Sequence, residues 1–152
     1  MIRVQEDDFD LGAEYQKMVE GNVDAGAVVA FVGRVRDFQN ANDGGDVTAM
    51  TLEHYPGMTE KELERIEIDA RARWPLTDSL IIHRVGRMTP GDQIVLVLTA
   101  SAHRQAAFDA ASYLMDYLKT QAPFWKCEET SDGDRWVDAR ESDTDALKKW
   151  ER

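Results

Sequence analysis

The stretch SLIIHRVGRMTPGDQIVLVLTA, residues 79–100, decides the fold that we expect for this chain. Its two apolar runs, 79–88 and 92–100, are rich in the β-branched and aliphatic residues typical of strands. Pro90 and Gly91 stand between the runs, and both residue types favour a tight turn. The stretch therefore predicts a pair of strands at the centre of a sheet.

Two long helices are predicted, one before this pair and one after it. Thr59 and Glu62 have the spacing of a capping box, and Pro75 marks the stop of the first helix. The second helix covers about 102–120. Both carry apolar residues at helical spacing, namely Leu63, Ile66 and Ala70 in the first and Ala107, Ala111, Leu114 and Leu118 in the second.

The remaining segments predict further strands and two shorter helices. An N-terminal helix, about 10–20, should end at Gly21, and the tail after 140 favours a short helix capped at Ser142. Strands are expected at 26–36 and 47–55 around a polar loop, 37–46, and at 124–129 and 135–140 around TSDGD, a hairpin turn sequence. Strands in hairpin-like pairs with two main helices between them indicate an α+β fold with antiparallel or mixed sheets.

Length and composition narrow the class of protein. The chain has 152 residues, which fits a single domain over 1–152, and its formal net charge is −11. Such a charge argues against general binding of nucleic acid or of an anionic membrane. No apolar run approaches the ~20 residues of a membrane span. The acidic start MIRVQEDDFD lacks a signal-peptide pattern, so we expect a cytoplasmic protein.

The segment SAHRQ at the start of the second helix puts cations where they are disfavoured. If Ser101 caps this helix, His103 and Arg104 occupy its first turn, beside the partly positive amide N–H groups. One interpretation is that the helix start and Arg104 bind an anion together. The other is an exposed arginine whose small cost is tolerated. On the strand at 26–36, Arg34 and Arg36 share one face.

Lys119 and Lys126 stand on either side of an apolar turn at Pro123. Lys119 has an ordinary interpretation, a cation that complements the C-terminal end of a helix. Lys126 can equally be an edge-strand lysine. Together they could face one pocket, where two ammonium groups lower each other's pKa and leave an amine able to act as base or nucleophile.

The length of the second helix constrains how these cations can cooperate. Arg104 and Lys119 are fifteen residues apart in the sequence, which is ~22 Å along a helix at ~1.5 Å per residue. A small substrate cannot touch both within one chain. The sequence therefore predicts either two separate sites or one site completed by a second subunit.

Cys127 and the histidines give weaker signals. Cys127 is the single cysteine, so no internal disulfide can form. Its neighbours Glu128 and Glu129 would raise a thiol pKa, which argues against a nucleophile. Histidines 54, 83 and 103 lack the spacing of metal ligands, so no metal site and no cofactor are expected.

Six blocks of the sequence resemble, in order, the catalytic (large) subunit family of molybdopterin synthase. They cover about 26–145, and they are GAVVAFVGRVRD, TLEHYPGMTEK, IIHRVGRMTPGD, SAHRQAAFDA, MDYLKTQAPFWKCE and DRWVDARESD. The resemblance implies an α/β-hammerhead fold and a homodimer within a heterotetramer. The partner would be a small ubiquitin-like sulfur carrier whose C-terminal Gly-Gly bears a thiocarboxylate. The substrate would be cyclic pyranopterin monophosphate, which receives two sulfurs in turn to form the dithiolene of molybdopterin.

The resemblance also assigns residues, position by position. The essential lysine of the family falls on Lys119 and its second functional lysine on Lys126. Cys127 lies at a variable position, and the loop 37–46 is longer than in close relatives. Substrate-binding positions fall on Arg34, Val35, Arg36, His103, Arg104, Lys119, Lys126, Cys127 and Glu128, and Arg140 matches a basic position near the pocket.

Two other functions stay open on the residues alone. A small phosphoesterase or nucleotide-binding protein would use His103 and Arg104, far from Lys119, and need no protein partner. A non-enzymatic adaptor would bind a basic protein through the acidic surface. Co-purification with a small protein ending in Gly-Gly, or retention of a pterin, separates both from the synthase.

Overall fold

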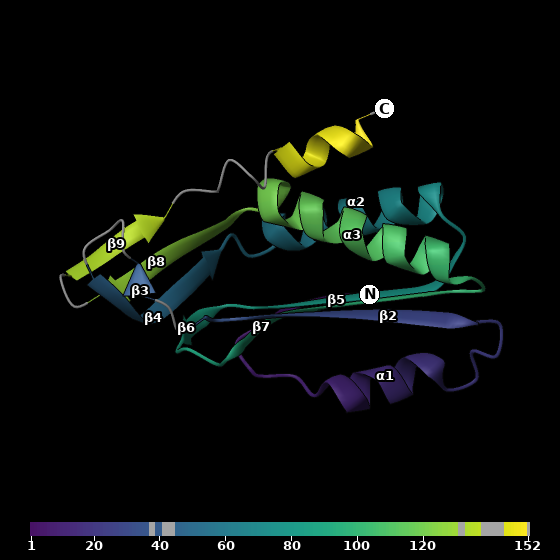
Figure 1. Ribbon diagram of the computed structural model, residues 1–152, viewed down its shortest axis with the longest axis horizontal. Helices are drawn as coiled ribbons and strands as arrows, with labels where there is room; N and C mark the ends of the chain where they lie inside the picture. The colour runs from purple at the N-terminus through teal and green to yellow at the C-terminus, as the bar shows by residue number, and fades with distance from the viewer. Residues whose placement is uncertain (37–38, 41–44, 131–132, 138–144, 152) are drawn as a thin grey trace.

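Two sheets lie along the long axis of the molecule, and helices cover both faces of the first (Figure 1). The structure is a computed structural model that describes residues 1–36, 39–40, 45–130, 133–137 and 145–151. Its helices are α1 (Leu11–Val19), α2 (Met58–Arg73), α3 (Arg104–Gln121) and the 3₁₀ helix η1 (Leu147–Trp150). Its strands are β1 (Ile2–Gln5), β2 (Ala27–Arg34), β3 (Gln39–Asn40), β4 (Gly45–His54), β5 (Leu76–Arg84), β6 (Gly86–Met88), β7 (Gln93–Ser101), β8 (Phe124–Thr130) and β9 (Gly133–Val137).

The first sheet has the strand order β1-β5-β7-β2. β7 pairs antiparallel with β5 and with β2, so Val97 lies between Ile81 and Phe31. The strand pair predicted from residues 79–100 is therefore confirmed. β1 joins the edge of β5 in parallel, a strand that the sequence did not predict.

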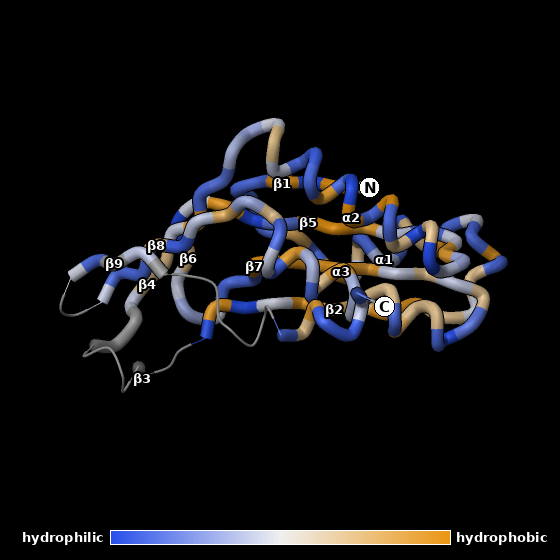
Figure 2. The backbone as a smooth tube through the Cα atoms, turned by 90° about the horizontal axis from the view of Figure 1, so that it is seen from above, coloured by the Kyte–Doolittle hydropathy of each residue, from blue (hydrophilic) through white to orange (hydrophobic). Residues whose placement is uncertain are grey.

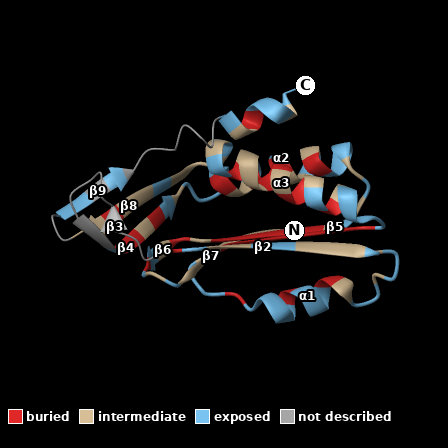
Figure 3. Cartoon of the chain, in the orientation of Figure 1, coloured by how far each residue is buried: buried red, intermediate tan, exposed pale blue. Residues whose placement is uncertain are grey.

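Both faces of this sheet are buried, which is why β5 and β7 are continuous apolar runs. Side chains alternate between the faces. Ile81 and Val97 pack against α2 and α3, while Leu80 and Leu98 belong to the core beneath α1. The helices turn their buried residues to the sheet (Figure 3), and the hydrophobic colour follows the central strands in Figure 2. The predicted helical stripes are confirmed as buried: Leu63, Ile66, Ala70, Ala107, Ala111, Leu114 and Leu118.

The second sheet extends beyond the end of the first. β4 and β8 pair antiparallel, and β9 adds to β8, so the predicted hairpin of 124–129 with 135–140 is confirmed up to Val137. β6 pairs with β4 on its other side. A small core of Val35, Met50, Leu52 and Met88 joins the two sheets. Strands and helices together confirm the expected α+β class.

The predicted strand 79–88 is in fact the end of β5 and the whole of β6, which are separated at Val85. Gly86 has φ +92°, a backbone conformation that favours glycine. The bend sends Gly86–Met88 away from the first sheet to pair with β4. The predicted turn at Pro90-Gly91 agrees with φ +94° at Gly91.

The predicted capping box of the first long helix was wrong by two residues. Gly57 is the N-cap, and its N–H donates to the carboxylate of Glu60 at 2.7 Å. Thr59 is fully buried, and its hydroxyl donates instead to the Pro123 carbonyl at 3.0 Å. The helix ends at Arg73, close to Pro75 as predicted.

Three further boundaries differ from the sequence expectation or refine it. Part of the predicted loop 37–46 is ordered as β3, which pairs with the first residues of β4. The N-terminal helix ends as predicted, since Gly21 follows it with φ +72°. The short C-terminal helix is present as η1 and the residues just before it, but Ser142, its expected cap, lies outside the described residues.

Candidate active site

α3 carries predicted site residues at both of its ends. Arg104 is its first residue and Lys119 lies in its last turn, which confirms that one continuous helix separates them. Fifteen residues at ~1.5 Å each give ~22 Å between their Cα positions. Within a single chain these two side chains therefore belong to two different places.

The start of α3 presents a cationic helix end. His103 is the N-cap, in place of the expected Ser101, and its side chain makes no capping hydrogen bond. Ser101 instead ends β7 and donates its hydroxyl to the Pro75 carbonyl at 2.8 Å. His103 and Arg104 are both exposed, and the first turn holds no acidic residue. Exposed backbone N–H groups beside an arginine can hold a phosphate or carboxylate.

The other end of α3 lies beside a buried histidine. The His83 ring stacks on Phe124, with 3.9 Å between ring centroids and an interplanar angle of 18°. His83 Nδ1–H donates to the Arg84 carbonyl at 2.9 Å, which fixes the neutral tautomer. Burial, with a smaller contribution from the charges of Lys119 and His54, lowers the pKa of His83 to about 4. Lys119 thus has a neutral imidazole as its neighbour.

β8 places Lys126 on the same face as Phe124, since alternate residues share a face. Lys126 Nζ lies 3.8 Å from Glu128 Oε1, and Glu128 is buried. Leu52, in the joining core, is the cross-strand partner of Lys126. Phe124 stacks on His83, and the charge of Lys119 lowers the pKa of His83. His83 is therefore close to both segments, and the turn at Pro123 brings Lys119 and Lys126 to one region.

Cys127 has the opposite orientation. It lies between Lys126 and Glu128 in β8, so its side chain points to the other face of the sheet. Its cross-strand neighbours there are Thr51 and Trp136. Cys127 is a free, half-buried thiol. Of the predicted substrate-binding run, the structure groups Lys126 with Glu128 and separates Cys127 from them.

The end of β2 reaches the junction of the two sheets. Val35 is buried in the joining core, next to Met50 and Leu52 of the second sheet. Arg34 and Arg36, on either side of it, are exposed. Arg34 donates two hydrogen bonds to the Gly91 carbonyl, at 3.2 and 3.3 Å. Leu52 packs with Val35 and is also the cross-strand partner of Lys126, so Arg34 and Arg36 lie near Lys126.

Sequence reasoning missed His83, Phe124 and His54 as parts of this region. His54 Nε2 lies 3.6 Å from Glu60 Oε1, an oxygen that is buried without a hydrogen bond. The available signal was His83 itself, a titratable side chain within an apolar strand. Arg140, expected near the pocket, lies outside the described residues.

The described residues contain no group of three or more His, Cys, Asp or Glu side chains able to hold a metal ion. None of the helices in the described ranges has the length and apolar character needed to cross a bilayer. The prominent polar groups are instead two lysines, three arginines and three histidines, namely Lys119, Lys126, Arg34, Arg36, Arg104, His54, His83 and His103. Such a set can bind anionic groups and transfer protons through a lysine.

Fold and site together define an α+β protein whose cations gather at a sheet junction and at one helix start. The model of the MoaE protein family matches residues 4–121. The molybdopterin synthase catalytic subunit of Pseudomonas aeruginosa is 58% identical over 150 residues, which are 99% of this chain and 98% of that protein. The chain belongs to the MoaE family.

Solved structures agree with this assignment. The molybdopterin biosynthesis MoaE protein from Burkholderia ambifaria superposes with a TM-score of 0.84 at 55% identity, covering 99% of this chain and 97% of that one. A complex of subunits 1 and 2 of molybdopterin-converting factor from Helicobacter pylori contains a chain of the same fold, with a TM-score of 0.74 at 19% identity and 91% coverage of both chains.

Proposed function

We propose that this chain is the catalytic subunit of a molybdopterin synthase. It would transfer two sulfurs, one after the other, from the C-terminal thiocarboxylate of a small ubiquitin-like carrier to cyclic pyranopterin monophosphate. The product is the dithiolene of molybdopterin. The observation that carries the proposal is the 58% identity, over 99% of the chain, to a curated catalytic subunit of that enzyme.

In this proposal Lys119 and Lys126 act at the sulfur-transfer step. In each transfer the thiocarboxylate sulfur would form a bond to a carbon of the pterin side chain as an oxygen leaves that carbon, and water would then hydrolyse the acyl–sulfur bond to the carrier. A neighbouring ammonium can stabilise the negative charge that develops and can donate a proton to the leaving oxygen. Neutral His83 supports this role, because a protonated imidazole would repel the Lys119 ammonium, whose charge already lowers the pKa of His83. Glu128, 3.8 Å from Lys126, would hold that lysine in place.

Anion binding would fall to the arginines and to the start of α3. Arg34, Val35 and Arg36 would line the substrate beside the lysines, together with Arg140 and the Lys126–Glu128 run. Because Cys127 points to the other sheet face, its contribution would come through its backbone. His103 and Arg104 would hold the cyclic phosphate, with the amide N–H groups of the helix start.

The ~22 Å length of α3 implies that each complete site uses two chains. His103 and Arg104 of one chain would meet Lys119 and Lys126 of the other, in a homodimer. One small carrier subunit at each end would make a heterotetramer. The solved Helicobacter pylori complex of two converting-factor subunits agrees with such a carrier partner. The proposal includes a single domain over 1–152 and a cytoplasmic location, where Cys127 would stay reduced.

The direct test is sulfur transfer by a Lys119→Ala variant. Purified chain, thiocarboxylated carrier and cyclic pyranopterin monophosphate are mixed, and molybdopterin is measured after conversion to a fluorescent pterin. We expect a loss of at least about a hundredfold in rate, the scale of losing a general acid or base. Lys17→Ala is the matched control, since Lys17 is exposed on α1 beyond the opposite face of the first sheet. Near-normal turnover by Lys119→Ala would refute the role.

A further inference from the structure

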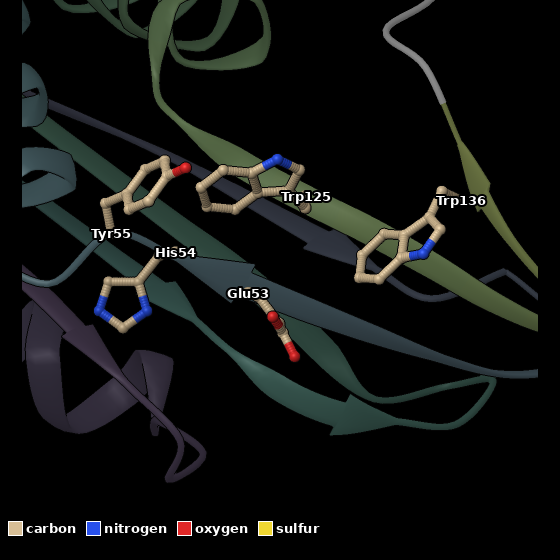
Figure 4. A pocket seen from close by; sticks show the side chains of 5 residues that line it. All are labelled: Glu53, His54, Tyr55, Trp125 and Trp136. Atoms are coloured by element: carbon tan, nitrogen blue, oxygen red, sulfur yellow. The ribbon is translucent and has the colours of Figure 1, made fainter.

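A pocket lies on the second sheet, on the face opposite the side chain of Lys126. It has a volume of about 410 Å³ and is lined by Glu53, His54, Tyr55, Trp125 and Trp136 (Figure 4). Trp125 precedes Lys126 in β8, so their side chains point to opposite faces. The aromatic wall of the pocket therefore faces away from Lys126, and His54 is the lining residue that it shares with the region around His83. The ligand chemistry argued below uses the other four lining residues and is independent of the proposed function.

Three exposed aromatic side chains form the wall of this pocket. Tyr55 and Trp125 meet edge to face, with ring centroids 4.1 Å apart. Trp136 lies opposite Cys127, diagonal to Trp125 across the β8–β9 pair and within reach of an aromatic ring. Tyr55 is 50% exposed, Trp125 36% and Trp136 63%. Adjacent exposed aromatics of this size are typical of interaction sites.

The pocket also contains a carboxylate. Glu53 is exposed and pairs directly with Trp125 across the β4–β8 ladder. Figure 4 shows Glu53 close to Trp125 and Trp136, with its carboxylate below the two indole rings in that view. Within the described part of the chain, no hydrogen bond or ion pair engages this carboxylate. Because Glu53 is exposed, a ligand in solution can reach its carboxylate.

We propose that Glu53, Tyr55, Trp125 and Trp136 bind an arginine side chain of a partner protein. A planar guanidinium stacks on indole faces and donates paired hydrogen bonds to a carboxylate. An anionic ligand would be repelled by Glu53, and a purely apolar one would leave its carboxylate desolvated. The pocket volume of about 410 Å³ is in the range of ligands larger than one side chain, so residues flanking the arginine fill the rest.

The pocket can be tested with the four tryptophan indole N–H signals in a ¹⁵N NMR spectrum. The probe is the peptide acetyl-Gly-Arg-Gly-amide, and the matched peptide carries citrulline, which has the same shape without charge. We expect the arginine peptide to shift the Trp125 and Trp136 signals. Trp74 and Trp150, which pack on each other beside α3, are internal controls and should not move.

Substitution of the carboxylate separates charge recognition from simple stacking. Glu53→Gln should weaken the binding of the arginine peptide by about threefold, as expected for the loss of an exposed ion pair. Glu64→Gln is the control, because Glu64 lies on the exposed side of α2, and it should leave the binding of the peptide unchanged. Equal shifts with the citrulline peptide, or none with arginine, would overturn the proposal. So would a lower oligomer mass for Trp136→Ala in ultracentrifugation, because a second copy of the chain would then occupy the pocket.

Discussion

Acidification should unfold this protein partly through His83. The side chain is 5% exposed, and burial lowers its pKa to about 4 from the ordinary value of 6.5. Between these two values the unfolded chain binds a proton that the folded chain refuses. The contribution of His83 to stability is therefore complete above pH 6.5 and is lost as the pH falls towards 4.

The size of the effect can be worked out from the two pKa values. The full gap between 6.5 and about 4 corresponds to about 3 kcal/mol, at 1.36 kcal/mol for each pKa unit. Between pH 7 and pH 4.5 the folded chain should lose about 2 kcal/mol from this group alone. Other titrating groups add their own pH dependence, so the test must be a difference between variants.

The assay is urea unfolding at pH 7 and at pH 4.5, at one fixed chain concentration. His83→Gln keeps an amide that can donate to the Arg84 carbonyl but cannot titrate. This variant should lose about 2 kcal/mol less than the wild type between the two pH values. Thr99→Val is the matched control, because Thr99 is a buried polar residue that donates to the Ala107 carbonyl and does not titrate.

Identical pH dependence of His83→Gln and wild type would refute this reasoning. It would mean that the folded chain binds the proton as readily as the unfolded chain does. NMR titration of the His83 ring gives the same answer independently, since its signals should stay unshifted until the pH approaches 4.

Two further predictions concern α3. If each site uses two chains, mixing the Arg104→Ala chain with the Lys119→Ala chain should restore activity, because a heterodimer of the two keeps one intact site. If no activity returns after subunit exchange has been confirmed, a site shared by two chains is excluded. Gly26→Ala should destabilise the fold by about 1–3 kcal/mol and weaken anion binding, because the new Cβ would lie 2.3 Å from the Ala102 carbonyl, just before α3. Calorimetry checks this, with Val23→Ala, 93% exposed, as the control; an unchanged Tm would contradict it.

Local patterns predicted the central strands and helices well, because burial there is periodic. Ala107, Ala111, Leu114 and Leu118 are all buried, as their spacing indicated. Predictions failed where tertiary contacts override local preferences. Thr59 has the residue type of a cap, yet its hydroxyl is used by Pro123, 64 residues away in the sequence.

The candidate site shows the same division. Lys119 and Lys126 stand out in the sequence because two cations flank one turn. The resemblance to a known family then identified them as the expected functional lysines. His83 is visible in the sequence as a titratable residue within an apolar strand, but its place beside the lysines depends on a ring contact with Phe124 from a distant strand. Glu53, Trp125 and Trp136 look like ordinary hairpin residues until the register of β4, β8 and β9 puts them together.

The fixed length of α3 restricts how the chain can vary. Inserting one residue in the middle of the helix would turn one end by about 100° relative to the other and shift it by about 1.5 Å. Lys119 would then leave the neighbourhood of His83 while Arg104 stayed in place. Such an insertion would also move the stripe from Ala107 to Leu118 out of the core. Length differences between functional relatives should therefore fall outside 104–121, and a gap there in an alignment would signal loss of the site.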